Sequence, residues 1–116
     1  MTLPGQLRVS VRQQTTRTTL ALDGELDLAT APTLRQHVVT QVAAGCRSMV
    51  LDLSGVTFLD STGLGQIVAT LKRLRSHDGE LVIVVSDRRI RRVLELCDLD
   101  RILDLRTTVP DEAGHE

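Results

Sequence analysis

Hydrophobic and polar residues alternate in two short segments near the amino end of the chain. Leu7, Val9 and Val11 alternate with polar residues, and a second alternating segment follows at 18–22. This period of two predicts half-buried strands, because successive side chains of a strand point to opposite faces. No helical pattern separates the two segments, and the polar stretch 13–17 predicts a hairpin. The two strands should therefore be antiparallel.

Three later segments have the spacing of amphipathic helices. Thr30 can cap the first helix, Pro32 fits its first turn, and Gly45 should end it. The second should end at 77–79, and Asp87 can cap the third. The expected inner faces contain Leu34, Val38 and Val42 in the first helix, Leu64, Ile67, Val68, Leu71 and Leu74 in the second, and Ile90, Val93, Leu94 and Cys97 in the third.

Apolar runs at 49–53 and 81–85 predict two further strands, and the first of them should be central, with both faces covered. We expect a break in periodicity at 24–27, a turn at 54–55 and a short edge strand within 102–105. Strands that alternate with helices predict an α/β fold with a mixed sheet of about four to five strands flanked by helices.

The length of 116 residues suits one domain. We expect this domain to span 3–108 and to be followed by a disordered polar tail, 109–116. Its 41% hydrophobic and 25% charged residues are ordinary for a globular protein.

Charge and aromatic content argue against two classes of partner. Fourteen basic and fifteen acidic residues give a net charge of -1, which favours neither a nucleic acid nor an anionic membrane. A single Phe, with no Tyr or Trp, offers little for stacking the bases of a single strand. No apolar run approaches the ~20 residues that span a bilayer.

Two further features predict a cytoplasmic protein. The first nine residues lack the charged start and hydrophobic stretch of a secretion signal. Cys46 and Cys97 lie far apart in sequence. Each is expected to be a small buried hydrophobic residue in a reducing compartment rather than half of a disulfide.

The most informative stretch is Asp-Ser-Thr-Gly-Leu-Gly at 60–65, where a strand is expected to end and a helix to begin. That is where α/β folds commonly place function. One interpretation is purely structural: Asp60 or Ser61 caps the helix, and the glycines allow close packing. The other is that Ser61 is phosphorylated.

A phosphate on Ser61 would meet unpaired N–H groups at the positive end of the helix dipole, so the fold could accept it. It would add a charge of about −1.5 to −2 beside Asp60 and Asp27. A partner docked there would be expelled by charge and bulk.

Other chemistry has little support in the sequence. Gly63-Leu64-Gly65 is only a fragment of a phosphate-binding loop. A serine hydrolase needs a G-x-S-x-G elbow, and the residue two positions before Ser61 is Leu59. The spacing of His and Cys residues predicts no metal site. The Arg-rich run at 88–92 is typical of the solvated face of an amphipathic helix.

Four stretches of the chain, at 24–32, 50–56, 58–65 and 79–83, resemble STAS-domain proteins of the bacterial anti-sigma factor antagonist family. The stretch at 58–65 matches the family's phosphorylation motif without a departure. The resemblance extends to Leu105 and covers nearly the whole chain. It implies a single-domain STAS-like fold.

The resemblance also implies a non-enzymatic partner switch. The unphosphorylated protein would bind an anti-sigma factor that is also a serine kinase, and so release a sigma factor. The kinase would phosphorylate Ser61, and a serine/threonine phosphatase would reverse the modification. The nucleotide belongs to the kinase, so no cofactor is assigned to this chain. The residues implied in partner binding are Asp27, Asp60, Thr62, Gly63, Leu64 and Gly65.

Two alternatives remain open. A STAS-type scaffold or accessory binding domain would have the same fold without phosphorylation control. An enzyme or nucleotide-binding protein would need the phosphate loop, metal ligands and catalytic base that the sequence does not supply.

Overall fold

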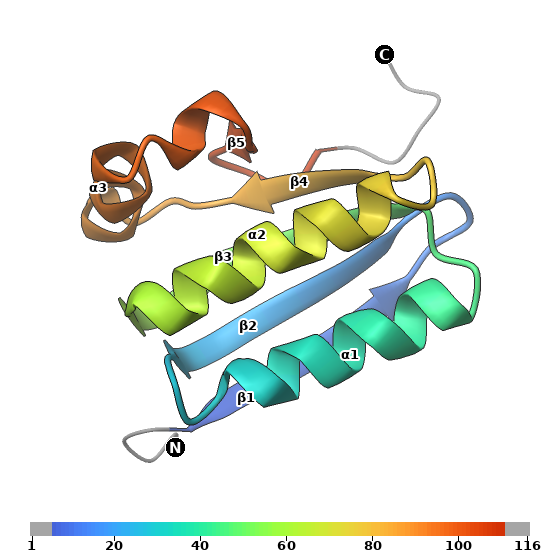
Figure 1. The fold of residues 1–116 in the computed structure, drawn as a ribbon, viewed down its shortest axis with the longest axis horizontal. Coiled ribbons are helices and arrows are strands. Elements are labelled where there is room, and N and C mark those ends of the chain that lie inside the picture. The colour runs from blue at the N-terminus through green and yellow to red at the C-terminus, as the bar shows by residue number, and fades with distance from the viewer. Residues whose placement is uncertain (1–5, 111–116) are drawn as a thin grey trace.

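A five-stranded mixed sheet with strand order β1-β2-β3-β4-β5 forms the centre of the computed structural model, which describes residues 6–110 (Figure 1). This confirms the predicted α/β class. The elements in chain order are β1 (Leu7–Gln13), β2 (Thr18–Leu26), α1 (Ala31–Ala43), β3 (Ser48–Leu59), α2 (Ser61–Arg75), β4 (Glu80–Val84), α3 (Arg88–Leu96), a 3-10 turn (Leu99–Arg101) and β5 (Asp104–Arg106).

The first two strands form the expected antiparallel hairpin. The N–H of Gln14 donates to the carbonyl of Arg17 at 2.8 Å and closes the turn. The other neighbouring strands are parallel, and β3 lies at the centre between β2 and β4. The prediction of a mixed sheet with a central third strand is therefore confirmed.

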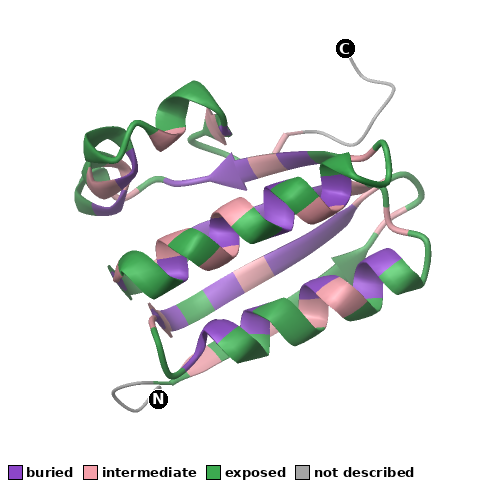
Figure 2. Ribbon diagram, viewed as in Figure 1, coloured by how far each residue is buried: buried purple, intermediate pink, exposed green. Residues whose placement is uncertain are grey.

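Helices α1 and α2 lie side by side on one face of the sheet (Figure 1). Their inward side chains pack on strand residues such as Leu20 and Leu51, both of which are fully buried. Figure 2 shows buried positions recurring along both helices and along β2 and β4. Helix α3 follows β4, packs against β3, and adds Ile90 and Leu94 to the same core. The expected inner face of the first helix is confirmed. In α2, Ile67, Leu71 and Leu74 are buried as expected and Leu64 packs against the core, whereas Val68 is only half-buried and the inner face uses Thr70 instead.

The turn predicted at 54–55 is wrong, because β3 continues through it, and the break predicted at 24–27 corresponds to irregular pairing within the last residues of β2. At 24–27, β2 runs on to Leu26 with register shifts against β3 at 21–23 and 24–25. At 54–55, β3 continues to Leu59. The Asp52 carboxylate accepts from both the N–H and the hydroxyl of Ser54, at 2.9 and 2.6 Å, so the polar pair is satisfied without a turn. The polar residues mark irregular strand pairing.

Two predictions about individual side chains also need correction. Thr30 occupies the cap position of α1, but its hydroxyl makes no cap bond and instead donates to the carbonyl of Glu25 at 2.7 Å. Cys97 is exposed rather than buried, because it lies beyond the last buried turn of α3. Cys46 is half-buried against the core. By contrast, Asp87 does cap α3 and accepts from the N–H of Arg89 at 2.7 Å.

The expected tail begins within the described residues. The carbonyl of Pro110 accepts a hydrogen bond from the guanidinium of Arg17. Residues 111–116, and residues 3–5 at the expected start of the domain, lie outside the described residues. The division into a domain and a tail stays a prediction.

Candidate functional site

Ser61 is the first residue of α2, at the carboxyl end of β3. The cap of this helix is Asp60, whose Oδ1 accepts from the N–H of Gly63 at 2.8 Å. Ser61 is exposed, and its hydroxyl has no hydrogen-bond partner within residues 6–110. Of the two residues that could have capped the helix, the structure uses Asp60. The hydroxyl of Ser61 has no structural task there.

The second oxygen of Asp60 reaches a different element. Oδ2 accepts from the N–H of Leu28 at 3.1 Å, in the loop between β2 and α1. The N–H of Asp60 also donates to the carbonyl of Leu26 at 3.4 Å. One side chain thus joins the start of α2 to the neighbouring loop.

Asp27 organises that loop from within. Its Oδ1 accepts from the N–H groups of Ala29 and Thr30, at 3.0 and 3.1 Å. The hydroxyl of Thr30 accepts in turn from the N–H of Asp27 at 2.9 Å. Asp27 and Asp60 therefore lie in adjacent segments at one end of the sheet, but both carboxylates are engaged in holding the backbone.

The other predicted site residues divide by exposure. Thr62 and Gly65 are exposed on α2 beside Ser61, whereas Leu64 is half-buried against the core. Gly63 is buried, and a Cβ atom placed on it would overlap the carbonyl oxygen of Leu26 and lie 3.0 Å from the Leu26 Cγ. Its visible role is to let α2 approach β2.

Two exposed apolar residues close to Ser61, Leu28 and Phe58, were not among the predicted site residues. Leu28 is 72% exposed, and its N–H binds the Asp60 carboxylate. Phe58 is 49% exposed and lies two residues before Asp60, near the end of β3. Phe58 is the only aromatic residue of the chain, which was an available signal. Leu28 gave none, since one Leu in a loop is unremarkable until its exposure is known.

Helix direction adds a shared electrostatic feature to this end of the molecule. Helices α1, α2 and α3 follow β2, β3 and β4 in the chain, and these three strands are parallel. Each helix therefore begins at the carboxyl end of the sheet, where its dipole is positive. An anion at Ser61 would be stabilised by the positive end of the α2 dipole.

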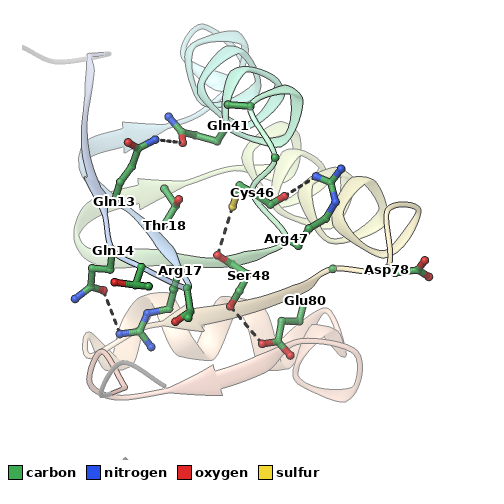
Figure 3. Close-up of a pocket in the computed structure, with 15 residues that line it drawn as sticks. Gln13, Gln14, Arg17, Thr18, Gln41, Cys46, Arg47, Ser48, Asp78 and Glu80 are labelled. Carbon is green, nitrogen blue, oxygen red and sulfur yellow. Dashed lines mark hydrogen bonds between the residues drawn. The ribbon is translucent and has the colours of Figure 1, made fainter. Parts of the chain in front are cut away.

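A hollow of about 590 Å³ lies at the opposite end of the sheet (Figure 3). It is lined by the hairpin turn and by the connections that lead into β3 and β4. Some of its polar side chains pair with one another: Gln13 donates to Gln41 at 2.8 Å, and Ser48 donates to Glu80 at 3.3 Å. It contains none of the predicted site residues.

Neither a metal centre nor a membrane span is visible in the part of the chain that the structure describes. No three His, Cys, Asp or Glu side chains in that part are grouped so that they could hold a metal ion. None of its helices has the length and apolar character needed to cross a bilayer.

Comparison with known proteins gives consistent results for sequence and fold. The sequence model of the STAS domain family matches residues 8–112. The anti-sigma-B factor antagonist of Staphylococcus aureus (strain NCTC 8325 / PS 47) is 39% identical over 80 residues, which cover 69% of this chain and 74% of that protein.

Solved structures show the same fold. An anti-sigma factor antagonist from Mycobacterium paratuberculosis superposes with a TM-score of 0.86 at 30% identity, over 94% of this chain and 92% of that one. The Bacillus cell fate determinant SpoIIAA, in its phosphorylated form, superposes with a TM-score of 0.68 over 86% of this chain and 92% of its own. At 19% identity, this second likeness shows the fold alone.

Proposed function

The chain belongs to the STAS-domain family of anti-sigma factor antagonists, and we propose that it antagonises an anti-sigma factor under the control of Ser61 phosphorylation. In its unphosphorylated form it binds an anti-sigma factor with serine kinase activity and so releases a sigma factor. That kinase phosphorylates Ser61, and a serine/threonine phosphatase restores the binding form. The chain itself acts as a binding protein and not as a catalyst.

The observation that carries this proposal is the exposed hydroxyl of Ser61 on a helix that Asp60 already caps. A serine needed for capping would be costly to modify, because its oxygen would be engaged with the backbone. Ser61 is free of that task, so a kinase can take its hydroxyl without disturbing the helix start. SpoIIAA, which has this fold, has been solved in a phosphorylated form, so the fold itself is compatible with a phosphate.

The proposed switch works by charge and bulk. The first N–H groups of α2 have no partners within the helix, and they favour an anion. The phosphate therefore fits the folded protein while adding about −1.5 to −2 charges next to Asp60. A partner whose surface touches Ser61 would have to bury this dianion, which is strongly unfavourable without matching cations.

We propose that the docking surface consists of the exposed positions around Ser61. These are Thr62 and Gly65 on α2, with Leu28 and Phe58 as apolar contacts on the adjoining segments. Asp27, Asp60, Gly63 and Leu64 contribute by fixing the shape of this surface.

The proposal is tested with the chain, ATP and purified anti-sigma factor kinases encoded in the same genome. One kinase should add a single phosphate, seen by intact mass, and fragment spectra should place it on Ser61. Ser61→Ala should abolish the modification, whereas the neighbouring control Thr62→Ala should still accept it. A phosphate found on Thr62 or elsewhere would overturn the assignment.

Binding separates the switch from a plain scaffold. Phosphorylation should weaken affinity for the anti-sigma partner by at least about tenfold, which needs only about 1.4 kcal/mol. Amide NMR spectra of the two forms should differ mainly around α2. Equal affinity of both forms would favour the unregulated scaffold.

A further inference from the structure

The outward face of α3 carries a row of three exposed side chains, Arg88, Arg92 and Leu96. Their spacing of four residues places them in one line along the helix. Leu96 is 69% exposed, whereas the opposite face buries Ile90 and Leu94 in the core. We call Arg88, Arg92 and Leu96 the basic stripe.

The charges of the basic stripe are not neutralised by neighbours. The other two arginines of α3 have carboxylate partners: Arg89 pairs with Asp87 at 3.2 Å and Arg91 with Glu95 at 3.3 Å. Across residues 6–110, Arg88 and Arg92 form no ion pair. Two uncompensated cations thus lie next to an exposed apolar side chain.

Helix stability does not account for this arrangement. The first turn of α3 contains no acidic residue, and arginines gather at the end where the helix dipole is already positive. Among residues 6–110, the carboxylate of the cap residue Asp87, which pairs with Arg89, is the one acidic group at this end of α3 that offsets the unfavourable interaction of the arginines with the dipole. Where natural sequences break such a local preference without a structural gain, the position is commonly functional.

The basic stripe belongs to the same end of the molecule as Ser61. Helix α3 begins after the carboxyl end of β4, as α2 does after β3, and these strands are parallel neighbours. Figure 1 shows α3 and the start of α2 at the same end of the sheet. Helix α3 also packs against β3, the strand that leads into Asp60. One partner could contact both.

We propose that the basic stripe is a second contact site for the anti-sigma partner, and that it receives an acidic surface with an apolar recess for Leu96. The identity of the partner rests on the proposed function. Arginines bind carboxylates through paired hydrogen bonds, and uncompensated cations at a rim accelerate the approach of an acidic surface. A phosphate on Ser61 would repel the same acidic partner. The arginines of α3 would therefore favour binding of this partner, and the phosphate on α2 would oppose it.

A nucleic acid is a poorer match for this stripe. DNA-binding proteins commonly neutralise about 6–10 phosphates, whereas the stripe offers two unpaired cations on a chain of net charge -1.

The test compares Arg88→Glu/Arg92→Glu with the matched control Arg8→Glu/Arg12→Glu, which makes the same change of charge at exposed positions on β1. The α3 variant should weaken binding of the purified anti-sigma partner by at least about tenfold, mainly through the association rate, and it should flatten the dependence of that rate on salt. The β1 control should stay within about twofold. Leu96→Ser should weaken binding through faster dissociation, without loss of stability. Circular dichroism verifies that each variant is folded.

The outcomes separate this inference from the proposed function. If the wild type binds the anti-sigma partner and the α3 variant binds it as well as the β1 control does, the basic stripe is not a contact site. The proposed function would remain intact. Failure of the wild type to bind any anti-sigma factor would remove the proposed function. A short polyglutamate peptide then tests the stripe alone, since it should shift the amide signals of α3 in the wild type and not in the variant. Tighter binding of a short DNA duplex than of polyglutamate would overturn the choice of an acidic protein surface.

Discussion

Gly63 lies so close to the main-chain carbonyl of Leu26 that a Cβ atom on it would overlap the carbonyl oxygen. The absence of a side chain at Gly63 allows the start of α2 to lie against the end of β2. Gly65, two residues later, has open space where a Cβ would lie. The two glycines of one short motif therefore have different roles, because only one of them faces the sheet.

Stability should separate the two glycines. Gly63→Ala should lower the free energy of unfolding by about 1–3 kcal/mol, since the added methyl group must displace backbone. Gly65→Ala is the matched control, and it should be neutral or raise the free energy by up to about 1 kcal/mol, because alanine is the better helix former. Urea denaturation measures both. Equal losses in the two variants would contradict the packing role of Gly63.

Asp60 should contribute more than an ordinary helix cap. Asp60→Ala removes the acceptor of the Gly63 N–H in α2 and the acceptor of the Leu28 N–H in the adjoining loop. We expect a loss of about 1–3 kcal/mol, the sum of one cap and one further hydrogen bond. Asp60→Asn keeps one acceptor oxygen and should lose less.

Hydrogen exchange provides the local measurement for Asp60. The amide of Leu28 should exchange faster in Asp60→Ala than in the wild type. Asp100→Ala, at an exposed position in the 3-10 turn, is the control and should change neither the stability nor the exchange. An unchanged Leu28 amide would show that Asp60 does not hold the loop in solution.

Acid should reduce the contribution of Asp87. Its hydrogen-bonded pairing with the Arg89 side chain, followed by its bond from the Arg89 N–H, lowers the pKa of Asp87 below the ordinary value of 3.8. A lowered folded-state pKa means that the stabilisation is complete above about pH 3.8 and is lost as the pH falls through the lowered pKa. Asp87→Asn should therefore have a lower free energy of unfolding than the wild type near neutral pH. This difference in stability should become smaller in acid.

Urea denaturation at a series of pH values tests this expectation. High salt should also reduce the difference in stability at neutral pH, because the Arg89 side chain of the pair is exposed to solvent. If the difference in stability between Asp87→Asn and the wild type stays constant down to the lowest pH, it does not come from the ionised carboxylate of Asp87.

The fold could be predicted because its signals are local and repeated. The alternation around Leu7 and Val9, the apolar run that begins at Met49 and the helical spacing of Leu71 and Leu74 each have one natural interpretation. The two missed continuations of β2 and β3 depend on shifts of pairing register between strands. A single strand's sequence does not record its register, so polar residues there resembled turns.

The candidate site was proposed as a stretch of sequence, and its geometry could not be predicted from that stretch. The motif placed Asp60 and Ser61 at the start of a helix, yet residue types alone could not decide which of them is the cap. The link from Asp60 to Leu28 joins residues 32 positions apart and is invisible to local patterns. Exposure of Leu28 and Phe58 likewise depends on the assembled fold.

If Leu28 and Phe58 are apolar contacts of the partner, removal of either should weaken binding, and removal of the largely exposed Leu28 should do so without weakening the fold. Leu28→Ser deletes a side chain that is 72% exposed, so the free energy of unfolding should change by less than about 0.5 kcal/mol. Burying a Leu side chain in an interface contributes about 1.5–3 kcal/mol, which corresponds to a loss of about tenfold or more in affinity. Phe58→Ser should have an effect at least as large.

Val11→Ser is the matched control, because Val11 is 41% exposed on β1, at the edge of the sheet away from α3. Isothermal titration of the unphosphorylated variants with the anti-sigma partner measures the affinities, and urea denaturation measures the stabilities. The heat-capacity change of binding should become less negative in Leu28→Ser, since less apolar surface is buried. If Leu28→Ser binds as tightly as Val11→Ser, the docking surface does not include the loop before α1. The contacts of the partner would then be confined to α2, Phe58 at the end of β3 and the basic stripe.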